Sequence, residues 1–263
     1  MKEIFKNDDY LKERTKFYFI DKFKNLESAK IFTDNKSYVV CQSAPGVQTW
    51  LWTLDNLSLN KLKELKQVLF DNYVTNEKIT FTSKKEVYNY IVSTNDNYEV
   101  DEYFEMGTLR CLNAIKPSEC DANVDHFHES DLDTAAKYYY LDQKEMELNS
   151  DVTIEYSYKH VKAWIENEKF FVLRNNEGKI VSMVGYDTFD VLAKLGNVYT
   201  PVEERRNGYC ANLVYFVSNK LLNEGFIPML FTNYNYINSN AAYKKVGYEE
   251  TGMLVNYTLK KKG

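Results

Sequence analysis

Apolar residues three and four positions apart predict a series of amphipathic helices along the chain. In the first half this spacing covers Asp9–Phe23 and Leu59–Tyr73, and Ser58 directly before the second run is a favoured N-cap residue. In the second half, Gly225 and Gly247 follow two such runs and would end them. We expect four helices there, at Asp131–Glu147, Tyr158–Asn167, Ala211–Asn223 and Ser239–Val246.

Short apolar runs predict strands between these helices. A hairpin is expected over Ala29–Cys41, and Gln48–Leu54 alternates enough to be a half-buried strand. Phe170–Arg174 and Lys179–Tyr186 flank a turn that ends in glycine, which predicts a second hairpin. Further short elements are expected at Lys78–Phe81, Lys85–Ile91, Tyr103–Leu112, Leu192–Thr200, Phe226–Thr232 and in a C-terminal segment that reaches Leu259.

The order of these elements predicts two domains of α/β class. The segment Lys116–Val124 combines proline with small polar residues, and we place a boundary there, between residues 1–120 and 121–263. In the second domain, antiparallel strands precede a strand–helix–strand–helix–strand series. This order is typical of a three-layer α/β architecture.

Composition narrows the function classes. With 263 residues and a net charge of −5, the chain has no general affinity for nucleic acid or for an anionic membrane. No apolar run approaches the ~18 residues of a membrane span, and the charged N-terminus does not resemble a secretion signal. We therefore expect a cytoplasmic protein with no membrane or nucleic-acid partner. The cysteines lack metal-ligand spacing and His126 and His128 lack a third ligand, so no metal is expected.

The junction Val198–Ala211 is the first candidate for chemistry. A strand ends there, a short loop carries Arg205, Arg206 and Gly208, and a helix begins. The first N–H groups of a helix have no internal acceptor, and the helix dipole favours an anion at that end. The segment therefore suits a phosphate, although an exposed loop with an incidental arginine pair is the alternative.

A second cluster follows about 35 residues later. Asn240 and Tyr243 lie three positions apart on a predicted short helix, so an amide and a phenol would face the same side. In the alternative interpretation, Asn238 or Ser239 caps this helix and Tyr243 packs into the core.

The two clusters together resemble the signature regions of the GCN5-related N-acetyltransferases (GNAT). The segments VYTPVEERRNGYCA and LFTNYNYINSNAAYKKVGY are most similar to the FR47-like subgroup, whose members read VYTPPEYRGKGYA and LYTDLANPTSNRIYRKIGY. The likeness covers roughly Asp125–Leu259. It implies a C-terminal GNAT fold, a mixed and mostly antiparallel sheet flanked by helices. We hypothesise that the N-terminal α/β domain is a degenerate copy of that fold.

The resemblance also implies roles for individual residues. Acetyl-CoA would be the co-substrate, with its pyrophosphate on the loop and its pantetheine arm along the strand and against Asn240. Tyr243 would be the general acid. The implied acetyl-CoA contacts are Val198, Tyr199, Thr200, Arg205, Arg206, Asn207, Gly208, Tyr209, Cys210 and Asn240.

Three positions depart from the family pattern. Arg206 stands where glycine is usual, Cys210 is the small residue that ends the motif, and Tyr236 replaces the asparagine of the ANP turn. Because Cys210 lies at a helix N-terminus, which lowers the pKa of a thiol, the alternative is that it acts as a nucleophile.

The leading hypothesis is direct transfer of an acetyl group to a primary amine, most simply a small molecule, in a ternary complex. Glu203, Glu204 and Asp187 are candidate bases, each weighed against a solvated surface carboxylate. The alternatives are a non-catalytic acyl-CoA-binding or regulatory module and an acyltransferase for a macromolecular amine. The sequence carries no signal for the oligomeric state.

Overall fold

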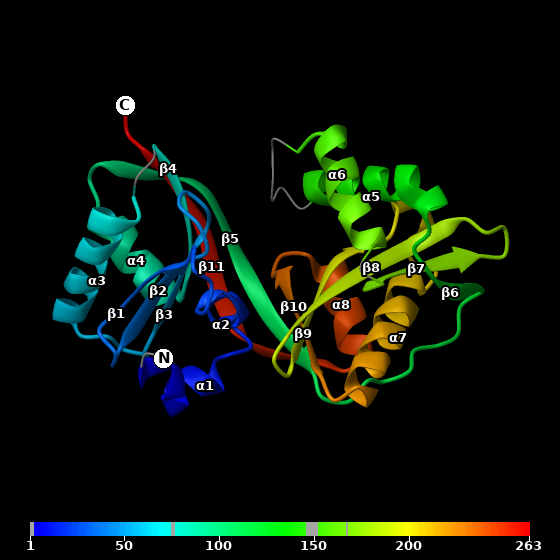
Figure 1. Ribbon diagram of the computed structural model, residues 1–263, viewed down its shortest axis with the longest axis horizontal. Coiled ribbons are helices and arrows are strands. Elements are labelled where there is room, and N and C mark those ends of the chain that lie inside the picture. The colour runs from blue at the N-terminus through cyan, green and yellow to red at the C-terminus, as the bar shows by residue number, and fades with distance from the viewer. Residues whose placement is uncertain (1–2, 75–76, 146–151, 167) are drawn as a thin grey trace. The chain divides into compact units, whose positions relative to one another are not determined.

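The computed structural model describes residues 3–74, 77–145, 152–166 and 168–263 (Figure 1). The chain forms two compact units. Unit 1 comprises Met1–Thr108, Asn233–Asn235 and Thr251–Gly263, and unit 2 comprises Leu109–Thr232 and Tyr236–Glu250. The last residues of the chain thus return to unit 1. The functional division predicted at residue 120 stays a prediction.

Unit 1 is a mixed α/β unit with strand order β1-β2-β3-β4-β11-β5. Strand β2 pairs antiparallel with both β1 and β3. Strands β3 and β4 pair parallel, and β11 pairs antiparallel with β4. The elements are η1 (Glu3–Lys6), α1 (Asp8–Lys12), α2 (Tyr18–Phe23), β1 (Lys30–Thr33), β2 (Tyr38–Gln42), β3 (Thr49–Thr53), α3 (Leu59–Asn72), β4 (Lys78–Ser83), α4 (Lys85–Ser93) and parts of β5 (Tyr98–Cys111) and β11 (Tyr248–Lys261).

The single helix predicted over Asp9–Phe23 is wrong, because the chain breaks there into α1 and α2. The Tyr10 hydroxyl donates to the buried Asp21 carboxylate at 3.0 Å, and Lys24 lies 2.6 Å from the same group. Arg14 is a third partner. In one continuous helix Tyr10 and Asp21 would be about 16 Å apart along the axis. The break brings Tyr10 and Asp21 together, and Arg14 and Lys24 balance the negative charge of the buried carboxylate.

Strand β3 is fully buried, which corrects the expectation of a half-buried strand. Leu51 packs in the core that includes Leu65 and Leu69 of α3. Trp52 has its ring 5.3 Å from that of Tyr10 in α1. Helices therefore cover both faces of this strand, and both sets of side chains leave water.

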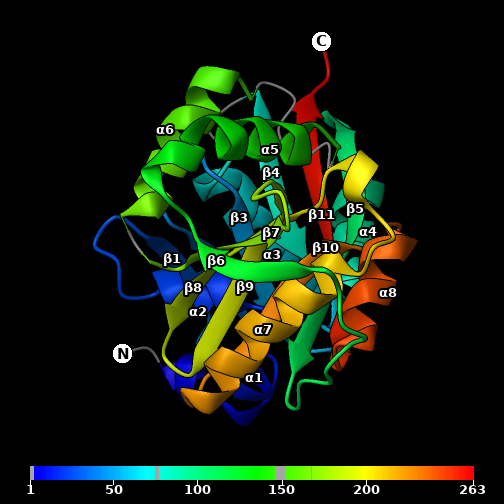
Figure 2. The same ribbon diagram turned by 90° about the vertical axis from the view of Figure 1, so that its right-hand side faces the viewer.

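Unit 2 is also α/β, with strand order β10-β9-β8-β7-β6. Strands β6 to β9 pair antiparallel, and β9 and β10 pair parallel. Helices α5 and α6 lie on one face of the strands and α7 on the other (Figure 2). The elements are β6 (Ala122–His126), η2 (Glu129–Asp131), α5 (Leu132–Glu145), α6 (Ile154–Ile165), β7 (Phe170–Asn175), β8 (Ile180–Phe189), β9 (Leu192–Tyr199), η3 (Val202–Glu204), α7 (Tyr209–Asn223), β10 (Ile227–Asn233) and α8 (Ile237–Lys245).

The helices and the hairpin expected in unit 2 are confirmed, with shifted ends. The predicted helical residues 146–147 and 167 lie outside the described residues. Strand β6 is an addition, and its first three residues fall in the segment taken as a domain boundary. It pairs on one side only, with β7, and its residues are half-buried or exposed. An edge strand with polar residues carries no apolar pattern, so the sequence gives it no strand signal.

The same order of elements occurs in both units. Strands β1, β2 and β3, helix α3, strand β4 and helix α4 have counterparts in β7, β8, β9, α7, β10 and α8. The strand senses also correspond, with a parallel pair around each intervening helix. This recurrence supports the hypothesis that unit 1 is a degenerate copy.

Gly185→Ala tests the packing of β8 against the Phe170 ring in unit 2. A Cβ at Gly185 would lie 2.4 Å from the ring of the buried Phe170, which is stacked on Trp164 at 4.4 Å and lies 5.3 Å from the ring of Phe127. We expect the substitution to lower the free energy of unfolding by about 1–3 kcal/mol. In the control Gly196→Ala, the Cβ meets only the flexible end of Lys194 at 3.1 Å. Chemical denaturation that gave equal losses for both variants would contradict this account.

Candidate functional site

The two parallel strands of unit 2 separate partway along their length. Strands β9 and β10 are paired only from Leu192 with Ile227 to Leu195 with Leu230. In addition, Gly185 pairs with Gly196 but Met183 with Tyr199, so β9 carries one extra residue relative to β8. Such a bulge takes backbone groups out of the ladder. The end of β9 therefore presents its backbone where the strands diverge.

The bulge is centred on Asn197. This residue has a φ of +54°, a left-handed conformation that asparagine tolerates better than most residues. The predicted contacts Val198, Tyr199 and Thr200 follow directly.

Helix α7 begins just after this point. Its N-cap is Gly208, with φ 79° and ψ 0° and no side-chain cap. The left-handed backbone explains why glycine stands there. Without a capping side chain, the first N–H groups of α7 keep the capacity to bind an anion. Asn207 precedes this cap and donates from Nδ2 to the Glu204 carbonyl at 3.2 Å, while Tyr209 opens the helix.

The two arginines of the loop have different surroundings. Arg205 donates from Nε to the Thr200 carbonyl at 3.0 Å and from Nη2 to the Glu145 carboxylate at 2.6 Å. Its guanidinium lies 5.9 Å from the Tyr199 ring centre. Arg206 is exposed and has a φ of +71°. Arg206 thus keeps the left-handed backbone that glycine at this position would favour.

Helix α8 places Asn240 and Tyr243 one turn apart. Tyr243 is only 7% exposed and its ring lies 6.0 Å from that of Tyr248. Burial, together with Cys210, Asp142 and Tyr248, raises the pKa of Tyr243 well above its usual value. The alternative expectation that Tyr243 packs into the core is therefore also confirmed, and the buried phenol holds its proton at neutral pH.

The expected cap of this helix is wrong. The helix begins at Ile237 with Tyr236 as the N-cap residue, so neither Asn238 nor Ser239 caps it. The Tyr236 hydroxyl instead donates to the Glu145 carbonyl at 2.6 Å. The tyrosine that departs from the family pattern therefore connects the start of α8 to the end of α5.

The nucleophile alternative for Cys210 loses its support. Burial raises the pKa of the Cys210 thiol to about 11, against the lowering influence of Arg205. At pH 7 about one thiol in ten thousand would be ionised. Cys210 serves as the small residue at the start of α7.

Helix α5 contributes a carboxylate that the sequence reasoning missed. Tyr138, Asp142 and Glu145 lie within about 60° of one another around the helix. Tyr138 has its ring 5.5 Å from that of Tyr199, and Glu145 binds Arg205. Burial raises the pKa of Asp142 to about 7, helped by Glu145 and opposed by Gln143 and Arg205. The only sequence signal was an aspartate four residues after a buried tyrosine.

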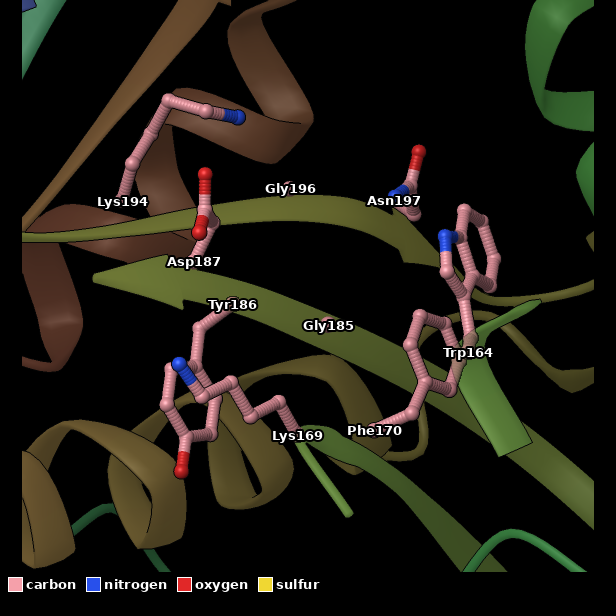
Figure 3. Close-up of a pocket in the computed structure, with 9 residues that line it drawn as sticks. All are labelled: Trp164, Lys169, Phe170, Gly185, Tyr186, Asp187, Lys194, Gly196 and Asn197. Carbon is pink, nitrogen blue, oxygen red and sulfur yellow. The ribbon is translucent and has the colours of Figure 1, made fainter. Parts of the chain in front are cut away.

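The three carboxylates proposed as bases are dispersed. Glu203 is exposed, and Glu204 lies 2.5 Å from Lys179. Asp187 lines a pocket of about 290 Å³ on the α6 side of the strands. Figure 3 shows Asp187 and Lys194, partners on adjacent strands, pointing to the same side of the sheet. Trp164 lies at the other end of this pocket beside Asn197 of the bulge.

The structure brings most of the predicted site residues to the divergent ends of β9 and β10 and the adjacent ends of α7 and α8. None of Arg205, Gly208, Cys210, Asn240 and Tyr243 lines the pocket of Asp187. Among the residues that the structure describes, no group of three or more His, Cys, Asp or Glu side chains is placed to hold a metal ion. Within the same residues, no helix has the length and apolar character to cross a membrane.

Comparison with known proteins assigns one segment of the chain to a family. The model of the acetyltransferase (GNAT) family matches residues 134–248, from α5 to the first residue of β11. This segment belongs to the GNAT acetyltransferase family. The likeness to the FR47-like subgroup stays a prediction. No curated protein matches the chain.

Solved structures, two of them of GNAT proteins, share the fold over almost the whole chain. An acetyltransferase of the GNAT family from Colwellia psychrerythraea is 14% identical, covers 96% of each chain and gives a TM-score of 0.59. A GCN5-related N-acetyltransferase from Kribbella flavida is 10% identical, with coverage of 98% of this chain and 97% of its own, at 0.63. A Drosophila protein is 13% identical, with coverage of 98% and 93%, at 0.64. These likenesses establish the fold class predicted from the sequence.

Asp142→Asn tests the raised pKa of this carboxyl group. Between about pH 4 and pH 7 the folded chain holds a proton that the unfolded chain has lost, so stability falls as pH rises through this window. Asparagine cannot ionise. We therefore expect thermal unfolding at pH 8 to show the variant stabilised relative to wild type, with a smaller difference at pH 4. A difference that is the same at both pH values would contradict the assignment.

Proposed function

We propose that the protein is an acetyl-CoA-dependent N-acetyltransferase that transfers the acetyl group directly to a primary amine within a ternary complex. The observation that carries this proposal is the glycine-capped start of α7 beside the point where β9 and β10 separate, within the segment of the GNAT family. Anion-binding amides and an accessible strand backbone are the two features that a pyrophosphate with a pantetheine arm requires.

The residues present fit acetyl-CoA at this place. The first-turn amides of α7, from Tyr209 and Cys210 onward, would receive the pyrophosphate, with Arg206 and Asn207 beside it. The backbone of Val198, Tyr199 and Thr200 would hydrogen-bond the pantetheine arm and the acetyl carbonyl, and Asn240 would bind the arm from α8. Arg205 would attract the phosphates electrostatically while its guanidinium stays bonded to the Glu145 carboxylate.

The main chemical cost lies in the acceptor amine. A lysine-like amine with a pKa of about 10.4 is neutral in only about one molecule in 2,500 at pH 7, which costs about 4.6 kcal/mol. An α-amino group near pKa 8 costs about 1.4 kcal/mol. A lysine-like acceptor therefore depends on a protein base more strongly than an α-amino acceptor does.

Tyr243 suits the acid role because burial keeps its phenol protonated. A phenol with an ordinary pKa near 10 gives a proton to a thiolate of pKa near 8.5 at a cost of about 2 kcal/mol, and burial increases that cost. The transfer is therefore expected to accompany cleavage of the C–S bond, as charge develops on sulfur. N–H groups at the bulge of β9 would stabilise the oxyanion of the carbonyl.

The pocket of Asp187 is the proposed approach for the acceptor. It reaches Gly196 and Asn197 of the bulge, and it is lined by one carboxylate, the ammonium groups of Lys169 and Lys194 and the indole of Trp164. A cavity of about 290 Å³ suits a small amine, so we favour a small-molecule acceptor over a macromolecular amine.

The non-catalytic alternative is an acyl-CoA-binding module. The presence of Tyr243 and Asn240 beside the strand separation favours an enzyme. The direct test is an assay of CoA thiol release from acetyl-CoA over a panel of amines. Acetyl-CoA binding without thiol release for any amine would favour the module, and the absence of binding would overturn both.

Tyr243→Phe removes the proposed acid and keeps the ring. We expect kcat to fall by roughly 10²-fold or more, while the Kd for acetyl-CoA from calorimetry changes little. Tyr248→Phe is the control, because this buried tyrosine bonds Ser218 at 2.8 Å and has no role in the reaction. An unchanged kcat for Tyr243→Phe at saturating substrates would remove Tyr243 from the acid role.

Replacing Arg205 and Arg206 together by alanine tests the anion site. We expect the Kd for acetyl-CoA to rise roughly tenfold, about 1.4 kcal/mol, because both arginines are partly exposed. Lys220→Ala removes a cation from the far end of the same helix and should leave Kd unchanged. Equal affinity of the double variant and wild type in a calorimetric titration would refute the anion site.

A further inference from the structure

The last turns of α5 face the place where β9 and β10 separate. Tyr138, in the turn before Asp142, donates from its hydroxyl to the Ile180 carbonyl at 2.9 Å and contacts Tyr199 of β9. Glu145, in the turn after it, binds Arg205 through its carboxylate and receives the Tyr236 hydroxyl on its carbonyl. Contacts on both sides thus fix the direction of the face that carries Asp142.

Asp142 therefore lies between residues tied to β9, to the loop before α7 and to the start of α8. It interacts electrostatically with Tyr243 of α8 and Tyr199 of β9. It also interacts with Tyr139, whose ring lies 5.2 Å from that of Trp164 in the pocket wall. These interactions link the carboxylate to the proposed acid and, by way of Tyr139, to Trp164 of the pocket lining.

We propose that Asp142 is the general base that takes a proton from the acceptor ammonium, an inference that rests on the proposed acetyltransferase function. The ionisable groups that interact with it are Glu145 and Tyr139 on its own helix, Tyr199 on β9, Arg205 in the loop and Tyr243 on α8. Burial raises the pKa of Asp142 to about 7. A base whose pKa lies near the working pH is the most effective for such a transfer.

The proton and bond balance is complete with these two residues. The ammonium gives one proton to Asp142, and the neutral nitrogen forms the C–N bond at the acetyl carbonyl carbon. As the C–S bond breaks, the sulfur takes the phenolic proton of Tyr243, and the second nitrogen proton restores the phenol. Asp142 then releases its proton to water. The sum is ammonium plus acetyl-CoA giving N-acetyl amide, CoA thiol and one proton.

The structure also says why the other carboxylates are weaker candidates. Glu204 is held by Lys179, and Glu203 is exposed. Asp187 lines the pocket proposed for the acceptor, where it lies opposite Lys194 on the adjacent strand, so it is suited to orient the acceptor there. Asp142 is the carboxylate that shares electrostatic contact with Tyr243.

The test compares the pH dependence of kcat/KM and the Kd for acetyl-CoA in wild type, Asp142→Asn, Asp142→Glu and Asp133→Asn. Asp133 is an exposed aspartate on the same helix that accepts a hydrogen bond from Tyr158, so its variant controls for loss of a negative charge. Spermidine and a dipeptide amide serve as probe acceptors. If neither is acetylated, the amine of the thiol-release panel with the highest rate serves as the acceptor.

We expect wild type to show an inflection near pH 7 that Asp142→Asn lacks. The asparagine variant should lose roughly 10²–10⁴-fold in kcat with little change in Kd, and Asp142→Glu should recover part of the rate with a shifted inflection. The proposal would be overturned if Asp142→Asn kept the pH profile and the kcat of wild type, or if Asp133→Asn lost as much activity as Asp142→Asn. Either result would leave the acetyltransferase function standing. Failure of wild type to bind acetyl-CoA would instead overturn the function itself.

Discussion

The pairing between β9 and β10 ends after four residue pairs, and the other features of the site depend on this limit. If the two strands stayed paired to their ends, the backbone at the end of β9 would be satisfied by β10 and no ligand could reach it. The bulge at Asn197 adds to the effect because it removes a residue from the ladder with β8. The chain then turns through Gly208 into α7, so free helix amides follow the exposed strand end within ten residues.

The site combines this backbone with side chains from α5 and α8. Tyr236 and Arg205 both bind Glu145 and so connect the end of α5, the start of α8 and the loop before α7. A half-buried carboxylate at Asp142 costs folding stability at neutral pH, where its solvation would be lost. Such a cost is typical of functional sites, where a perturbed proton affinity serves chemistry rather than stability.

Features set by neighbours in sequence could be predicted from the sequence, and features set by distant partners could not. Ser58 before α3 and the glycine after α7 marked helix ends, and the loop of Arg205 with Gly208 marked the family. The break between α1 and α2 depends on Asp21 meeting Tyr10. The burial of β3 depends on helices from both directions, and the role of Asp142 depends on α5 facing β9. None of these leaves a local pattern.

The same element order occurs in both units, but only unit 2 has the loop with Gly208, so acetyl-CoA is expected to bind unit 2 and not the corresponding loop of unit 1. The loop from β3 to α3 in unit 1 has neither arginine nor glycine. Amide hydrogen exchange with and without acetyl-CoA is the most direct measurement. The account predicts slower exchange at residues 197–200 and at the first turn of α7, and unchanged exchange at residues 54–60. Protection confined to unit 1, or no protection at the start of α7, would contradict it.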